Sequence, residues 1–305
     1  MLKFILIAIM IFTISDAFGY QWPLESFNQQ HQINAALGEY RNDRFHNGVD
    51  IQVNAGINVY SVVDGIVAAV YGETDNSYMV VRDTNGNTYR YVHIVPLLEK
   101  DDRVKMGVTV IGTIKNIGAP HLHFSENDGS KNPLREGGLT PFKDDAKPVI
   151  NNVDFWKQET NEQLTTRLYG HIDIRVNAYD PRTSATGDDA GGNCGIYKIS
   201  IEFWQGGKQI GNKIEYIKFD KIPSCSVDLV YDTDSTMTNF YYWATNDPFN
   251  EPYNKYWNSN QRTGSDYTVD ARVPMEALYG ESNLLIKVIA EDIKGNQAVY
   301  SIGKQ

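Results

Sequence analysis

Two pairs of polar residues in the first half of this 305-residue chain are spaced to act together. His121 and His123 are two residues apart, so on a β-strand both imidazoles point to one face. His46 and Asp50 are four residues apart and share a face if the chain between them is extended. Two imidazoles and one carboxylate suit zinc, and a set of three protein ligands leaves a fourth position open to water, as catalytic zinc sites do.

A fifth polar residue, His93, extends this group. Tyr89, Tyr91 and His93 alternate along the chain, so a strand would place all three on one face. Tyr91 is then as well suited to line a cleft as to be an ordinary strand aromatic. A bound zinc activates water, and hydrolysis also needs a base or a hydrogen-bond donor nearby. Spacing alone does not tell a ligand from a catalytic partner within His121 and His123.

Three motifs in this order resemble the LytM/lysostaphin-type zinc metallopeptidases, a family that cuts peptide bonds in bacterial peptidoglycan. They are His-x-x-x-Asp at 46–50, Tyr-x-His at 91–93 and His-x-His at 121–123, and the resemblance covers about residues 35–135. It implies a barrel-like antiparallel β fold of the duplicated-hybrid-motif kind. It also implies that zinc is bound by His46, Asp50 and His123. His93 and His121 would not bind the metal but would orient the water, act as general base and stabilise the oxyanion.

The rest of the first region reads as short strands separated by Gly, Asn and Asp turns. We expect strands at 58–63, 65–71, 78–82 and 88–94, with a hairpin turn at 83–87 between the last two. No helical periodicity of useful length interrupts them. Residues 20–142 are therefore predicted to form an antiparallel β domain, which ends at a linker over residues 143–150.

Residues 151–305 are predicted to form a second β domain, so the fold class of the whole chain is all-β. Apolar residues alternate with polar ones at 172–178, 199–203 and 286–290, as half-buried strands require. Gly206-Gly207 supplies a turn. Spaced strands of this kind favour an immunoglobulin-like β-sandwich, with long loops at 180–193 and 239–264.

The N-terminus has the pattern of a secretory signal peptide. Lys3 precedes an apolar run at 4–13, and Ala17 and Gly19 are small residues at the positions that a signal peptidase reads. The alternative is a membrane anchor, but the run has only about half of the roughly 20 residues that a spanning helix needs. We expect cleavage after Gly19, no transmembrane segment in the mature chain, and a protein that is exported to the periplasm or the cell exterior.

The two cysteines, Cys194 and Cys225, are free to pair in an exported protein. A disulfide between them is the favoured interpretation, and two free buried thiols are the alternative.

Four further residues could contribute to a site or have only a structural role. Arg41 and Arg44 precede the first motif, where they would meet a substrate carboxylate or simply lie on the surface. We interpret His171 as a structural strand residue and His31 as a solvated or edge residue.

The net charge of the chain limits the kinds of partner that it can bind. The formal net charge of −10 lacks the basic footprint of a nucleic-acid binder. It also gives no help in binding an anionic wall polymer, so a shaped groove must hold the substrate. The leading hypothesis is an exported zinc metalloendopeptidase that acts on peptidoglycan stem peptides or cross-links.

The second domain would position the enzyme, bind the wall or contact a protein partner. The alternative functions are a non-catalytic scaffold or activator of other wall hydrolases, and a wall-binding module with structural zinc.

Overall fold

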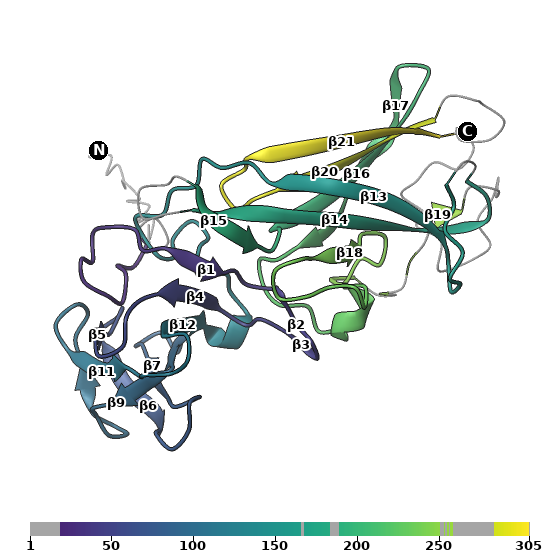
Figure 1. Cartoon of the computed structure of the whole chain (residues 1–305). Helices are drawn as coiled ribbons and strands as arrows, with labels where there is room; N and C mark the ends of the chain where they lie inside the picture. Colours follow the sequence, from purple (N-terminus) through teal and green to yellow (C-terminus); the bar gives the residue numbers. More distant parts are fainter. Residues whose placement is uncertain are drawn as a thin grey trace, which may run out of the picture.

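The computed structural model describes residues 19–165, 168–183, 189–250, 253, 255, 257–258 and 284–304 (Figure 1). The predicted signal peptide at 1–19 lies outside the described residues except for Gly19. The described part is all-β, as predicted, with only two short 3-10 turns at Asn127–Gly129 and Val227–Leu229. Within it, no helix is long and apolar enough to cross a membrane.

The first region is built on one antiparallel sheet of seven strands. Their order across the sheet is β1 (Ile33–Ala35), β4 (Val49–Gln52), β12 (His121–Glu126), β8 (Thr88–Val92), β7 (Tyr78–Arg82), β6 (Gly65–Tyr71) and β10 (Arg103–Val104). A smaller sheet has the order β5 (Asn58–Tyr60), β11 (Val110–Ile114) and β9 (Ile94–Pro96). A hairpin of β2 (Tyr40–Arg41) and β3 (Arg44–Phe45) precedes the first motif.

Alternation along β12 separates the core from the face that carries the histidines. Leu122 and Phe124 are fully buried, whereas His121 and His123, which alternate with them, are only partly buried. The strand lies between β4 and β8, so its two histidines stand over the middle of the large sheet. The predicted hairpin turn at 83–87 joins β7 to β8, and Asp83 Oδ1 accepts hydrogen bonds from the backbone of Asn85 and Asn87.

The strand expected at 88–94 is interrupted. The prediction that Tyr89, Tyr91 and His93 share one face of it is therefore wrong. His93 has a φ of +64°, which is in the left-handed region and not in the β region. This residue separates β8 from β9. Tyr91 is fully buried and its hydroxyl accepts a hydrogen bond from the backbone of Val62, so it does not line a cleft. The left-handed turn at His93 removes its side chain from the face of the tyrosines.

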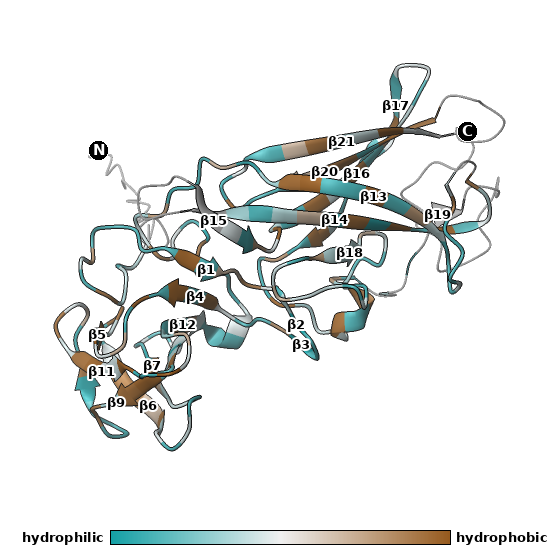
Figure 2. Cartoon of the chain, viewed as in Figure 1, coloured by the Kyte–Doolittle hydropathy of each residue, from teal (hydrophilic) through white to brown (hydrophobic). Residues whose placement is uncertain are grey.

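The second region is a sandwich of two antiparallel sheets. One sheet contains β13 (Val149–Lys157), β14 (His171–Thr183), β15 (Asp189–Cys194), β18 (Tyr241–Trp243) and β19 (Trp257–Asn258). The other has the order β17 (Lys208–Lys218), β16 (Lys198–Gln205), β20 (Leu284–Glu291) and β21 (Gln297–Lys304). Buried apolar residues from both sheets belong to one core cluster. Figure 2 shows where hydrophobic residues lie along these strands. An immunoglobulin-like connectivity and the boundaries of the two domains stay predictions.

The alternating segments at 172–178, 199–203 and 286–290 lie in β14, β16 and β20, as predicted. Gly206 and Gly207, with φ of +55° and +79°, form the turn between β16 and β17. The prediction of a long loop at 180–193 is wrong for its first and last residues, because these belong to β14 and β15, which pair as a hairpin. Residues 184–188 lie outside the described residues. The loop expected at 239–264 contains β18 and β19, and 259–264 lies outside the described residues.

The disulfide predicted between Cys194 and Cys225 is also wrong, because no disulfide joins them in the described part of the chain. Cys194 is buried in the core of the first region, whereas Cys225 packs at the edge of the core of the second. The two side chains therefore lie in separate apolar clusters.

Phe45 belongs to the first region but is buried in the core of the second. Cys194 shows the reverse relation, since it comes from the second region and is buried in the core of the first. Its ring lies 6.2 Å from that of Tyr231 and 6.5 Å from that of Phe219, centroid to centroid. The β2–β3 hairpin is thus held by the sandwich (Figure 1).

Candidate metal centre

Three of the predicted site residues meet at one point of the large sheet. His123 on β12 lies directly opposite Asp50 on β4, and His46 comes from the segment just before β4. His123 Nδ1 and His46 Nε2 are each 3.0 Å from Asp50 Oδ1, and these two nitrogens are 2.9 Å apart. The structure therefore brings together the three residues that the first and third motifs supply.

The donor set fits zinc. Ligands of a tetrahedral zinc at 2.0–2.1 Å lie about 3.3 Å from one another, and the three separations here are within a few tenths of an ångström of that value. Burial lowers the pKa of His123 to about 4, so its imidazole is neutral at neutral pH. Burial would raise the pKa of Asp50, but His46 and His123 bring it well below its usual value. Both groups are thus in the unprotonated form that a metal requires.

His46 is oriented by a second hydrogen bond. Its Nδ1 lies 2.8 Å from the carbonyl oxygen of Ala36, which can only accept, so Nδ1 carries the proton. Nε2 is left with the lone pair that faces Asp50 and His123. A backbone carbonyl behind a metal-binding histidine is a common orienting partner.

Gly48 allows the first motif to approach β12. A Cβ at this position would lie 2.3 Å from the carbonyl oxygen of Phe124 and 3.0 Å from the ring of His123. Only glycine lets the segment from His46 to Asp50 pass so close to the strand.

His121 and His93 lie beside the three-residue cluster. Their rings are 4.5 Å apart, and His121 Nε2 is 3.7 Å from Asp50 Oδ1. His121 Nδ1 donates to the carbonyl of Ala119 and His93 Nδ1 donates to that of Asp75, both at 2.8 Å. Each ring therefore keeps a lone pair on Nε2. Burial, with a smaller contribution from His121, lowers the pKa of His93, so its neutral form is favoured.

A wide groove of about 990 Å³ runs over these histidines. Arg44, Tyr78 and Arg90 of the first region line it, and so do Met237 and Thr238 of the second region. The sandwich therefore forms part of the wall above the candidate site. No sequence signal predicts this contribution, because Met237 and Thr238 belong to no motif.

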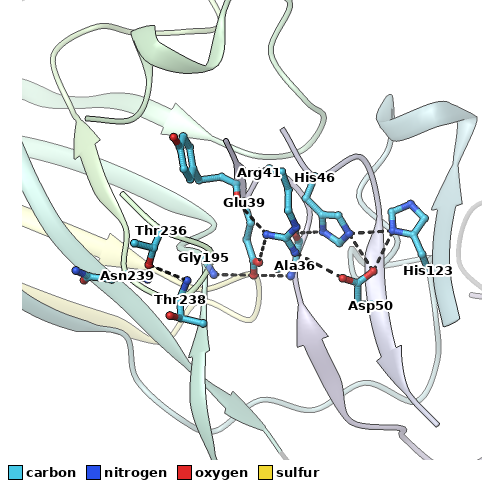
Figure 3. A network of polar contacts seen from close by, with 12 residues as sticks. Ala36, Glu39, Arg41, His46, Asp50, His123, Gly195, Thr236, Thr238 and Asn239 are labelled. Atoms are coloured by element: carbon cyan, nitrogen blue, oxygen red, sulfur yellow. Dashed lines mark hydrogen bonds and ion pairs between the residues drawn. The ribbon is translucent and has the colours of Figure 1, made fainter. Parts of the chain in front are cut away.

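Arg41, which sequence reasoning left between substrate contact and surface, turns toward the cluster instead (Figure 3). Its guanidinium lies 3.5 Å from Asp50 Oδ2 and 3.1 Å from Glu39 Oε2. Asp50 thus offers Oδ1 to the histidines and Oδ2 to the arginine. Arg44 is exposed and pairs with Asp43.

Glu39 is a site residue that sequence reasoning missed. Its side chain is 1% exposed, and Oε1 accepts hydrogen bonds from the backbone of Ala36 at 2.6 Å and of Gly195 at 2.9 Å (Figure 3). Burial raises its pKa, although Arg41 and His46 oppose the rise. Glu39 lies close to the first motif in sequence, but its partner Gly195 is 156 residues away.

The two remaining histidines take no part in the cluster. His171 lies on β14 in the second region, in line with the structural role expected for it. His31 packs at 5.4 Å from the ring of Trp22, and its Nε2 is buried, so it is less exposed than expected.

Comparison with known proteins finds one family model that matches part of the first region. Residues 44–133 match the model of peptidase family M23, and this span contains all five candidate residues. The resemblance of this region to LytM/lysostaphin-type peptidases is thereby confirmed.

Among solved structures, the chain is similar to a zinc-containing peptidase from Vibrio cholerae, with 27% identity and a TM-score of 0.31 over 37% of each chain. It is similar to the catalytic domain of lysostaphin from Staphylococcus simulans, with 25% identity and a TM-score of 0.28 over 32% of this chain and 79% of that one. It is also similar to LytU, with 23% identity and a TM-score of 0.28 over 35% of this chain and 78% of that one. The match spans only about a third of the length of the Vibrio cholerae peptidase.

Proposed function

We propose, from the premise that residues 44–133 are a peptidase family M23 region, that the chain is an exported zinc metalloendopeptidase. Its substrate would be the stem peptides or cross-links of peptidoglycan, and it would act in the periplasm or outside the cell. The observation that carries the proposal is the convergence of His46 Nε2, Asp50 Oδ1 and His123 Nδ1 within 3.0 Å of one another, beside two further histidines.

His46, Asp50 and His123 would hold the zinc. When bound, zinc supplies the acidity that lets water attack a peptide carbonyl at neutral pH, and it polarises that carbonyl. Asp50 stays ionised and His123 stays neutral in this setting, so neither ligand needs to lose a proton when the metal arrives.

His121 and His93 would handle the protons. Each donates from Nδ1 to a backbone carbonyl, which fixes the ring and leaves Nε2 able to accept. His121 Nε2 lies 3.7 Å from Asp50 Oδ1, a position from which it would take a proton from the attacking water as general base. His93, whose ring centroid is 4.5 Å from that of His121, would orient the attacking water by accepting a hydrogen bond at Nε2. The protonated His121 would then pass its proton to the leaving amine.

The groove would set the substrate class. It is wide enough for an extended peptide, and Arg44 and Arg90 in its wall suit the carboxylates of a wall peptide. Met237 and Thr238 add a wall from the second region, which supports a role for the sandwich in holding substrate.

Digestion of purified peptidoglycan, with the released fragments weighed by mass spectrometry, tests the function. The unsubstituted chain should release fragments cut at a peptide bond, and His121→Ala should bind zinc as before yet lose about 100-fold or more in rate. If the unsubstituted, zinc-loaded chain releases no fragments, the enzyme is excluded and the scaffold or wall-binding alternative stands. If His121→Ala digests at the normal rate, the role of His121 as general base is wrong.

A further inference from the structure

Three aspartates meet in the second region, away from the candidate zinc site. Asp144 lies just before β13, Asp180 lies on β14, and Asp292 lies between β20 and β21. All three are buried, with exposed fractions of 8%, 8% and 1%. One carboxylate oxygen from each lies within 4.8 Å of the other two. Three segments that are distant in sequence thus direct like charges at one point.

Hydrogen bonds satisfy two of these carboxylates but not the third. Asp292 Oδ1 accepts from the backbone of Lys294 and Asn296, and its Oδ2 accepts from the Asn296 side chain. Asp144 Oδ1 accepts from the backbone of Ala146 at 3.1 Å. Asp180 Oδ1 is buried and has no hydrogen-bond partner. A buried carboxylate oxygen without a partner is costly, and cations are the usual partners of such groups.

Lys294 offsets part of this negative charge, because its ammonium interacts electrostatically with Asp144 and Asp292. That ammonium lies over the ring of Phe142, 4.9 Å from the ring centroid. Burial, and then the neighbouring carboxylates, raise the pKa of Asp180 well above its usual value. Glu39 adds a further negative charge on its side.

A small cavity adjoins the cluster. Its volume is about 40 Å³, and Asp144 and Asp180 are among the residues that line it. A space of this size is large enough for one ion or one to two water molecules. Asp144 and Asp180 therefore border an open space next to the cluster.

We propose that Asp144, Asp180 and Asp292 bind a divalent cation of the hard, oxygen-preferring class, with Ca²⁺ as the best fit. Three carboxylates without imidazole or thiolate favour Ca²⁺, Mg²⁺ or Mn²⁺ over zinc. Ca²⁺ tolerates irregular geometry and fills its remaining positions with carbonyl oxygens and water. The ion would join the segment before β13 to β14 and to the β20–β21 turn, and so stabilise the sandwich next to its junction with the first region.

Titration of the full chain with CaCl₂ tests this proposal, and His123→Ala serves as the parent so that the candidate zinc site does not contribute. We expect calorimetry to report one Ca²⁺ per chain and the Tm to rise by about 5 °C at a 100-fold excess over Kd. Asp180→Asn in this parent should lose the Ca²⁺ response, and its metal-free form should be more stable than the metal-free parent because a buried charge is gone. Asp145→Asn, an exposed neighbour, is the matched control and should respond like the parent.

Absence of Ca²⁺ binding to the parent at millimolar concentration would overturn the proposal, whether or not any variant folds. An undiminished response in Asp180→Asn would overturn it as well. A titration with ZnCl₂ that gives tighter binding than CaCl₂ at this cluster would contradict the assignment to the oxygen-preferring class.

Discussion

The buried carboxylate of Glu39 accepts a hydrogen bond from the backbone N–H of Gly195, 2.9 Å away in the second region. The same side chain pairs with Arg41, and Arg41 pairs with Asp50, which is a candidate zinc ligand. The sandwich therefore reaches the candidate metal centre through two side chains (Figure 3). The ring of Phe45 buried in the sandwich core holds the same segment from its other end.

Glu39→Gln should weaken zinc binding, because it removes the negative charge that holds Arg41 against Asp50. Loss of an orienting partner behind a metal ligand typically costs 10–100-fold in metal affinity, so we expect a decrease of about 10-fold. Competition with a chromophoric chelator measures it. Glu99→Gln, at an exposed carboxylate, is the control. An affinity equal to that of the unsubstituted chain would show that Glu39 does not act on the metal centre.

Gly48→Ala should disturb both stability and the metal centre. The added methyl would lie 2.3 Å from the carbonyl of Phe124, so β12 or the first motif must move. We expect a loss of about 1–3 kcal/mol in the free energy of unfolding, as for other overpacked positions, together with weaker zinc binding. Denaturant unfolding measures the first effect. Gly118→Ala is the comparison, since nothing lies within 4 Å of its added methyl, and equal stability of the two variants would contradict the close approach.

Titration of the denatured chain with a thiol reagent, without reductant, should count two thiols, because no disulfide joins Cys194 to Cys225. In the folded chain the reaction should be slow at neutral pH. Cys194 is buried, and burial raises the pKa of Cys225 to about 11, so little thiolate is present. A count of zero in the denatured chain would restore the disulfide that the sequence favoured.

The two failures of sequence reasoning nearest the site have one physical cause each. Alternation along 88–94 predicted that the side chains of His93 and Tyr91 share a face. The φ of +64° at His93 breaks this alternation, and a histidine does not signal a left-handed turn in a sequence. Glu39 was missed because its role depends on Gly195, a backbone group 156 residues away. By contrast, strand periodicity predicted that His121 and His123 share a face, and the family resemblance implied that His123 joins His46 and Asp50. Both signals come from residues that are close together within each motif, and the structure places His123 opposite Asp50.

Asp173 should make part of the stability of the sandwich depend on pH. Burial, with a contribution from Glu159, raises its pKa to about 7, while Thr245 opposes the rise. The folded state therefore holds this proton more tightly than the unfolded state, so the contribution to stability is complete below about pH 4 and is lost as pH rises through about 7. Asp173→Asn should gain stability over the unsubstituted chain at pH 8 and little at pH 4. A difference that does not change between these pH values would contradict the raised pKa.

The central claim is that His46, Asp50 and His123 hold a catalytic zinc. Its most direct test measures zinc per chain by elemental analysis, and peptidoglycan digestion, on the same preparations of the unsubstituted chain and His123→Ala. We predict about one zinc per chain with digestion for the former, and less than about a tenth of each for the latter, with both preparations folded by circular dichroism. A folded, unsubstituted chain that takes up no zinc, or a His123→Ala chain that keeps its zinc and digests at the normal rate, would contradict it.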